Sequence, residues 1–129
     1  MDEPTWLSRR VVDAMQRELI AEHRGLHGIR DEGLIDSALS KPRNRWAYEP
    51  DADLAELCAS YGFGLARNHG YLDGNKRIAL AAMHVFTRRN GFAITVSEVE
   101  EVAVVLQLAE GSLCEADLAV WIREHLRPI

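Results

Sequence analysis

His-Gly-Tyr-Leu-Asp-Gly-Asn-Lys-Arg, residues 69–77, separates two apolar segments of the chain, because seven of its nine residues are polar, charged or glycine. The apolar residues before it follow the three- and four-residue spacing of a buried helix face, at Leu54, Leu57, Cys58, Tyr61 and Leu65. The apolar residues after it continue a second helical pattern, at Ile78, Leu80, Ala81, Val85 and Phe86. We therefore expect two helices joined by a polar loop, with the first helix central to the fold and residues 74–76 in the first turn of the second.

The start of the second helix has the composition of a phosphate site. A helix start presents unpaired N–H groups and a partial positive charge. Gly74 allows this backbone to approach a ligand closely, and Lys76 and Arg77 add two cationic donors. Together these features predict an anion site suited to phosphates.

Two further side chains of the loop supply the remaining chemistry. Asp73 is a hard oxygen ligand for Mg²⁺, which normally accompanies nucleotide phosphates. His69 can accept a proton near neutral pH. Transfer of a phosphorus group from a nucleotide to a hydroxyl group is the predicted reaction. A purely structural interpretation, in which these groups only cap the two helices, would not require so many of them in one short loop.

The chain before this unit predicts two helices. Ser8 is a plausible N-cap for an amphipathic helix that ends before Gly25. Asp31 caps a shorter helix over residues 32–40, and Pro42 is expected to stop it. The central helix then begins at Asp51 or Asp53.

The later elements are expected in this order: a helix over residues 75–90, an extended segment at residues 92–96, a helix from a Ser97–Glu100 capping box to about Gly111, and a last helix from Ser112 or Cys114 toward Pro128. Six helices with one irregular insert and little strand predict an all-α fold.

The irregular insert is residues 41–50, which contain two prolines, two aromatic residues and three cations. Arg43 and Arg45 beside Trp46 and Tyr48 are typical of a surface that binds nucleic acid, because aromatic rings stack on bases and cations contact phosphates. The same residues are equally compatible with aromatic rings packed on the core and solvated arginines.

Length and composition fit one soluble globular domain over residues 1–129, with 47% hydrophobic and 27% charged residues. The net charge of −5 argues against sequence-independent coating of nucleic acid. Cys58 and Cys114 lie far apart and are expected to be reduced thiols. We see no apolar leader and no run of about 20 apolar residues, so we expect a cytoplasmic protein without a membrane span.

The motif at residues 69–77, written HxYxDGNKR, closely resembles that of the Fic/Doc superfamily, whose Fic branch reads HxFx(D/E)GNGRxxR. Lys76 stands where Fic enzymes have a second glycine, and Leu80 stands where they have a second arginine, so the resemblance is to the Doc branch. It extends to residues 28–34, 47–49 and 88–91 and therefore covers most of the chain.

The resemblance implies a bundle of about six helices with a short β-hairpin flap at the 41–50 segment, where Arg43, Arg45, Trp46 and Tyr48 would orient a protein substrate as an added strand. It implies ATP and Mg²⁺ as cofactors and gives each loop residue a role: His69 as the catalytic base, Asp73 as the metal ligand, and Gly74, Asn75, Lys76 and Arg77 as phosphate binders.

Doc-like toxins phosphorylate a threonine of translation elongation factor Tu, which arrests translation, and a Phd-like antitoxin inhibits them. The resemblance therefore implies a protein kinase that contacts DNA only through its antitoxin. Three alternatives remain: transfer of a nucleotide monophosphate to protein (AMPylation), as in Fic enzymes; a non-catalytic repressor component that binds the antitoxin; and a toxin that attacks RNA.

Overall fold

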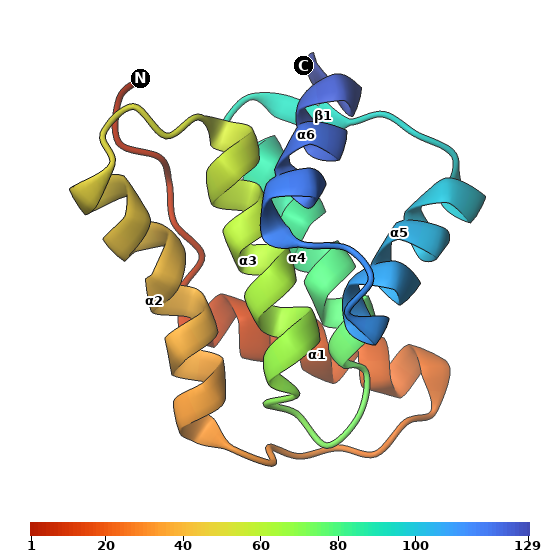
Figure 1. Ribbon diagram of the computed structural model, residues 1–129. Helices are drawn as coiled ribbons and strands as arrows, with labels where there is room; N and C mark the ends of the chain where they lie inside the picture. The colour runs from red at the N-terminus through yellow and green to blue at the C-terminus, as the bar shows by residue number, and fades with distance from the viewer.

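Six helices and two short strands make up the fold, in a computed structural model that describes residues 1–129 (Figure 1). In chain order they are α1 (Arg9–His23), α2 (Glu32–Tyr48), α3 (Leu54–Asn68), α4 (Asn75–Arg89), β1 (Phe92–Ile94), α5 (Glu98–Glu110), α6 (Glu115–His125) and β2 (Leu126–Pro128). The predicted all-α class and the number of helices are confirmed. None of the helices combines the length and the apolarity that crossing a bilayer requires.

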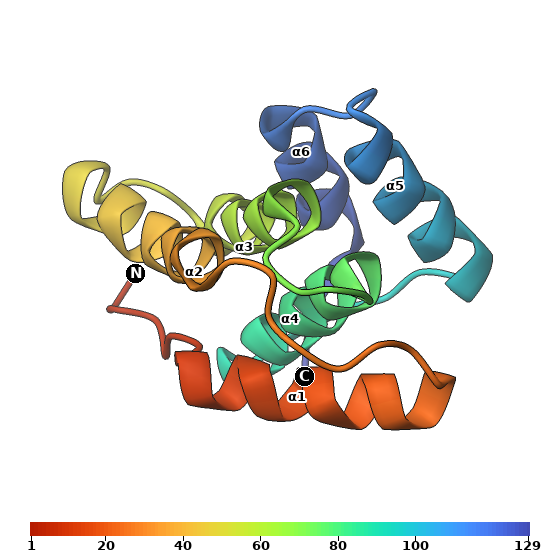
Figure 2. The same ribbon diagram turned by 90° about the horizontal axis from the view of Figure 1, so that it is seen from below.

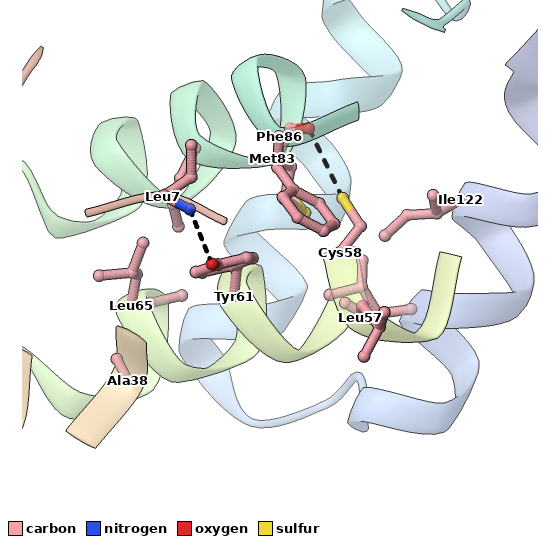
Figure 3. Packing of buried hydrophobic residues seen from close by; sticks show 14 of the residues in the cluster. Leu7, Ala38, Leu57, Cys58, Tyr61, Leu65, Met83, Phe86 and Ile122 are labelled. Atoms are coloured by element: carbon pink, nitrogen blue, oxygen red, sulfur yellow. Dashed lines mark hydrogen bonds between the residues drawn. The ribbon is translucent and has the colours of Figure 1, made fainter. Parts of the chain in front are cut away.

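Helix α3 lies at the centre of the molecule, as predicted, and packs against α2, α4, α5 and α6. Tyr61 and Cys58 are fully buried on it, and both make polar contacts inside the core (Figure 3). The Tyr61 hydroxyl accepts a hydrogen bond of 3.0 Å from the backbone N–H of Leu7, and the Cys58 thiol contacts the carbonyl oxygen of Met83 at 3.6 Å. Burial raises the pKa of the Cys58 thiol well above its usual range, so the thiol stays protonated.

Two glycines allow the neighbours of α3 to approach it closely. A Cβ atom added to Gly62 would lie 2.4 Å from the sulfur of Met83 on α4. A Cβ atom added to Gly64 would lie 3.1 Å from the Cβ and 3.2 Å from the Cα of Ala38 on α2. Both helices therefore pack directly on the backbone of α3.

Most helices begin where the sequence predicts. The side chains of Ser8, Asp31, Asp53 and Ser97 accept hydrogen bonds from backbone N–H groups in the first turns of α1, α2, α3 and α5. The reciprocal capping box forms at Asp53 and Glu56. At Ser97 only half of the predicted box forms, because the carboxylate of Glu100 accepts a hydrogen bond from Trp121 instead.

The prediction that Pro42 stops the second helix is wrong, since α2 continues through it to Tyr48. Proline removes one helical hydrogen bond and clashes with the preceding turn, which costs about 3 kcal/mol in a helix interior. Tertiary contacts offset this cost: Pro42 is buried, and Arg45 forms ion pairs with Glu56 at 2.6 Å and Glu115 at 3.1 Å. Long-range contacts of this kind leave no local signal in the sequence.

The expected flap at residues 41–50 is therefore absent, and its four proposed substrate contacts, Arg43, Arg45, Trp46 and Tyr48, lie on the second half of α2. The antiparallel strand pair forms elsewhere, between β1 and β2, with Ala93 opposite Arg127. Strand β1 lies within the segment at residues 92–96 that was predicted to be extended. Its partner β2 was not predicted, because residues 126–128 are too few to show a strand pattern.

We expect Gly64→Val to lower the free energy of unfolding by about 1–3 kcal/mol, because the added side chain overlaps Ala38 in a close-packed interface. Gly33→Val is the matched control, since Gly33 is also helical but exposed, and it should change stability by less than about 0.5 kcal/mol. Urea denaturation followed by circular dichroism measures both. Equal stability of the two variants would show that α2 does not pack on Gly64.

Candidate active site

The loop between α3 and α4 carries the six residues predicted for catalysis, metal binding and phosphate binding. It lies at one end of the central helices, beside the segment that joins α1 to α2 (Figures 1 and 2). A pocket of about 410 Å³ opens there, lined by His69, Leu72, Asp73, Gly74, Asn75, Lys76 and Arg77. The structure thus brings all six predicted residues to one pocket.

Backbone hydrogen bonds tie this loop to residues 28–31. The N–H groups of Arg30 and Asp31 both donate to the carbonyl oxygen of Gly70, at 2.8 and 3.0 Å, and the N–H of Leu72 donates to that of Gly28 at 3.1 Å. A Cβ atom on Gly70 would lie 2.3 Å from the side chain of Ile35, so only glycine fits at this approach to α2. The loop is therefore held by backbone hydrogen bonds to a neighbouring segment.

Arg30 holds the backbone at His69. Its guanidinium group donates to the carbonyl oxygens of His69 at 2.6 Å and Asn68 at 3.0 Å, which are left unpaired at the end of α3. His69 adopts a left-handed conformation with φ of 51°, which ends the helix. Its imidazole is exposed and makes no hydrogen bond with the rest of the protein, so it is available to a ligand in the pocket.

Asn75 closes the loop with two hydrogen bonds to the backbone of Tyr71. Its Oδ1 accepts from the Tyr71 N–H at 3.1 Å, and its Nδ2 donates to the Tyr71 carbonyl oxygen at 3.0 Å. Both polar atoms of the Asn75 side chain are therefore already hydrogen-bonded within the protein. The prediction that Asn75 binds phosphate now depends on its backbone N–H.

The first turn of α4 leaves three N–H groups without an acceptor in the protein, those of Asn75, Lys76 and Arg77. Gly74 precedes them as the N-cap, with φ of 75°, and provides no side chain to bond them. A helix start with unpaired N–H groups attracts anions, and here two exposed cationic side chains lie on the same turn. This geometry fits the phosphates of a nucleotide.

Asp73 is oriented by two backbone hydrogen bonds. Its carboxylate accepts from the N–H of Leu26 at 3.2 Å and from the N–H of Gly74 at 2.8 Å. These two hydrogen bonds lower the pKa of Asp73 below its usual value, and the bond from Leu26 has the larger effect. The carboxyl group is therefore ionised at neutral pH. Each oxygen keeps a further lone pair, and the carboxylate lines the same pocket as the start of α4, so the residues present fit a divalent ion bound together with phosphates.

Tyr71 faces away from this pocket. Its hydroxyl donates to the carboxylate of Asp13 on α1, which also pairs with Arg9 at 2.9 Å. Burial and the bond to Asp13 raise the pKa of Tyr71 above its usual range. The hydroxyl that distinguishes this position from the phenylalanine of the Fic motif therefore has a structural partner.

Sequence reasoning missed the residues that support the loop, above all Arg30 and Gln16. Arg30 lies in the segment 28–34, and only the family resemblance relates this segment to the motif. Gln16 donates to the carbonyl oxygen of Asp73 at 2.6 Å. A signal for it existed, since it stands between Val12 and Ile20 at four-residue spacing on the buried face of α1.

The four residues of the expected flap do not belong to this pocket. Arg45 contacts Glu56 in the first turn of α3, whereas His69 follows the last turn, and a helix of that length separates them by about 20 Å. Arg43 lies over the ring of Trp6, and Tyr48 is 87% exposed. These side chains lie on the far half of α2, and none of them lines the pocket at residues 69–77.

We expect Tyr71→Phe to lower the free energy of unfolding by about 1–2 kcal/mol, because it removes a hydrogen bond to a charged and partly buried carboxylate. Tyr48→Phe is the control, since its hydroxyl has no protein partner, and it should leave stability unchanged. Urea denaturation at pH 7 compares the two. If both variants were as stable as the parent chain, the bond to Asp13 would contribute nothing.

Comparison with known proteins identifies a matching family and similar proteins. The model of the Fic/DOC family matches residues 6–87, which include the whole loop. The chain is 34% identical over 105 residues to "Protein kinase doc" of Escherichia phage P1, an alignment that covers 81% of this chain and 82% of that protein. It is 43% identical over 65 residues to "Toxin Doc" of Mycolicibacterium smegmatis, which covers 49% of each.

Proposed function

Because the chain belongs to the Fic/DOC family, we propose that it is a Doc-type toxin of a toxin–antitoxin system that transfers the γ-phosphate of ATP to a hydroxyl group of a protein. The observation that carries this proposal is the pocket in which an exposed histidine lies beside three unpaired N–H groups. The relative from phage P1 is named a protein kinase, and that from Mycolicibacterium smegmatis is named a toxin. The proposed target is elongation factor Tu, so the protein would act in the cytoplasm and arrest translation.

In the proposed reaction, the N–H groups of Asn75, Lys76 and Arg77 and the two cationic side chains bind the phosphate oxygens. His69 takes the proton of the acceptor hydroxyl. The acceptor oxygen then forms a bond to the γ-phosphorus while the bond from that phosphorus to the β–γ bridging oxygen breaks, and ADP leaves. The hydrogen bond that the Arg30 guanidinium group donates to the His69 carbonyl oxygen keeps the His69 backbone in place.

Asp73 would hold Mg²⁺ beside the phosphates, where the ion supplies neutralisation of their negative charge. The support for this role is the position of the carboxylate in the pocket and its lowered pKa. Because the N–H groups of Leu26 and Gly74 fix the carboxylate, it needs no rearrangement to serve as a ligand.

Lys76 supports transfer of the γ-phosphate over transfer of a nucleotide. Fic enzymes have glycine at this position, which leaves room for the inner phosphates against the backbone. Lys76 instead places an exposed cation on the first turn of α4, and its side chain would occupy that room. The nucleotide would then enter in the reverse direction and present its γ-phosphorus to the hydroxyl group that His69 activates.

We expect label from ATP radiolabelled at the γ-phosphorus to appear on purified elongation factor Tu, and label at the α-phosphorus not to appear. Lys76→Gly should lose this activity. Arg10→Gly is the matched control, since Arg10 is also an exposed cation at the second residue of a helix, and it should keep full activity. Transfer from the α position would instead establish AMPylation. Transfer of neither label would favour a non-catalytic binding component.

We expect His69→Ala and His69→Asn to lower the rate of transfer by about 10²- to 10⁴-fold, the usual effect of losing a general base. Asparagine tolerates the left-handed backbone at this position, so a loss in both variants reports on chemistry and not on the fold. Nucleotide affinity, measured by isothermal titration, should stay within about twofold, because the phosphates are held by α4. The control is His23→Ala, at an exposed histidine without a hydrogen-bond partner, which should transfer phosphate as fast as the parent chain. Full transfer by His69→Asn would show that His69 is not the general base.

The proposed regulator is a Phd-like antitoxin, and a surface next to the phosphate pocket supports it. An apolar pocket of about 230 Å³ lies between α4 and α5, lined by Lys76, Arg77, Leu80, Val102, Val105 and Leu106. Val102 and Leu106 remain 48% and 43% exposed. This surface fits the apolar face of an amphipathic helix, with acidic residues beside the two cations. Contacts to DNA would be made by the antitoxin alone.

A further inference from the structure

Gln16 is a polar residue in an apolar position. It lies on the face of α1 that packs on the molecule, one turn from Val12 and one turn from Ile20, and only 5% of its surface is exposed. An apolar residue would complete this face without cost. Burial of an amide here therefore requires a reason in terms of what the amide contacts.

The amide makes one hydrogen bond and leaves one atom unpaired. Its Nε2 donates to the carbonyl oxygen of Asp73 at 2.6 Å, whereas its Oε1 is buried and has no partner. A buried acceptor without a donor is destabilising, since it loses its hydrogen bonds to water. The protein thus retains a group that costs stability, directly behind the phosphate pocket.

The bond from Gln16 completes the fixation of one peptide unit. The unit between residues 73 and 74 carries the Asp73 carbonyl oxygen, which Gln16 holds, and the Gly74 N–H, which the Asp73 carboxylate holds at 2.8 Å. Glycine at position 74 has φ of 75° but can adopt many other conformations. Hydrogen bonds at both ends prevent this peptide from rotating.

Packing alone does not fix the peptide. A pocket of about 240 Å³ lies between α1 and residues 27–29, and Gln16 and Ile20 border it. Ile20 also approaches Gly74, because its Cδ1 would lie 3.1 Å from a Cβ atom added there. The contact between Ile20 and Gly74 is apolar, so it does not determine in which direction the Asp73 carbonyl group points. The directional constraint from α1 comes from Gln16.

We propose that Gln16 is a positioning residue for phosphate transfer: it locks the Asp73–Gly74 peptide, and thereby the direction of the Asp73 carboxylate and of the unpaired N–H groups of α4. This inference rests on the proposed function, because it assigns the locked groups to phosphates and Mg²⁺. It also makes α1 part of the active site, although no residue of α1 lines the phosphate pocket.

Gln16→Met tests the proposal, because methionine matches the shape of glutamine but neither donates to Asp73 nor leaves an unpaired oxygen. Affinity for the magnesium–ATP complex should fall by about 10-fold or more, as for other groups that orient ligands. The urea midpoint should be unchanged or higher. In amide NMR spectra of the unliganded protein, the signals of Gly74, Asn75, Lys76 and Arg77 should shift or broaden.

Ile20→Val is the matched control, since it removes one methylene group from the same face of α1 and from the contact with Gly74. Its urea midpoint should fall while its affinity for magnesium–ATP stays that of the parent chain. Parent-like affinity and amide signals in Gln16→Met would overturn the proposal, and so would a parallel loss of midpoint and affinity in both variants. If the parent chain binds no magnesium–ATP, the proposed function fails instead, and the amide signals still decide whether Gln16 holds the loop.

Discussion

The burial of α3 is the constraint on which the rest of the structure depends. Because other elements cover this helix on most sides, its two ends are held in fixed places relative to the core. The Asp53–Glu56 capping box fixes the first turn, and Arg30 binds the two carbonyl oxygens at the last. The loop between α3 and α4 therefore leaves α3 from a defined point, and a short loop is enough to place His69 and the start of α4 at the same pocket.

The loop combines nearly complete internal hydrogen bonding with a small set of groups left available. The carbonyl oxygens of Asn68, His69, Gly70, Tyr71 and Asp73 all accept hydrogen bonds from the protein. The N–H groups at the start of α4 and the imidazole of His69 have no such partners. A preorganised site of this kind loses little conformational entropy when a ligand binds, because the backbone around it is already ordered.

Local patterns predicted the helices well because their signals lie within a few residues. Ser8, Asp31 and Asp53 each bond a backbone N–H three residues later, and such pairs are visible in the sequence. Six of the seven residues that line the pocket were also predicted as site residues, since they are consecutive or nearly so. Prediction failed where distant contacts decide the outcome, as at Pro42, where the ion pairs of Arg45 sustain a helix that local rules would end.

The contacts that support the loop were not predicted for the same reason, although the spacing of Gln16 on α1 marked it as buried. The sequence separation of these contacts has a consequence of its own. Gln16 and Asp73 are 57 residues apart, and Arg30 and His69 are 39 residues apart. During synthesis the loop emerges after both of these residues, so each of these two long-range contacts reaches back to an earlier part of the chain. A fragment that contains only α3, the loop and α4 would carry the complete motif but not the bonds that orient it. The nine-residue motif marks the position of the site, whereas hydrogen bonds from α1 and from residues 28–31 orient its backbone.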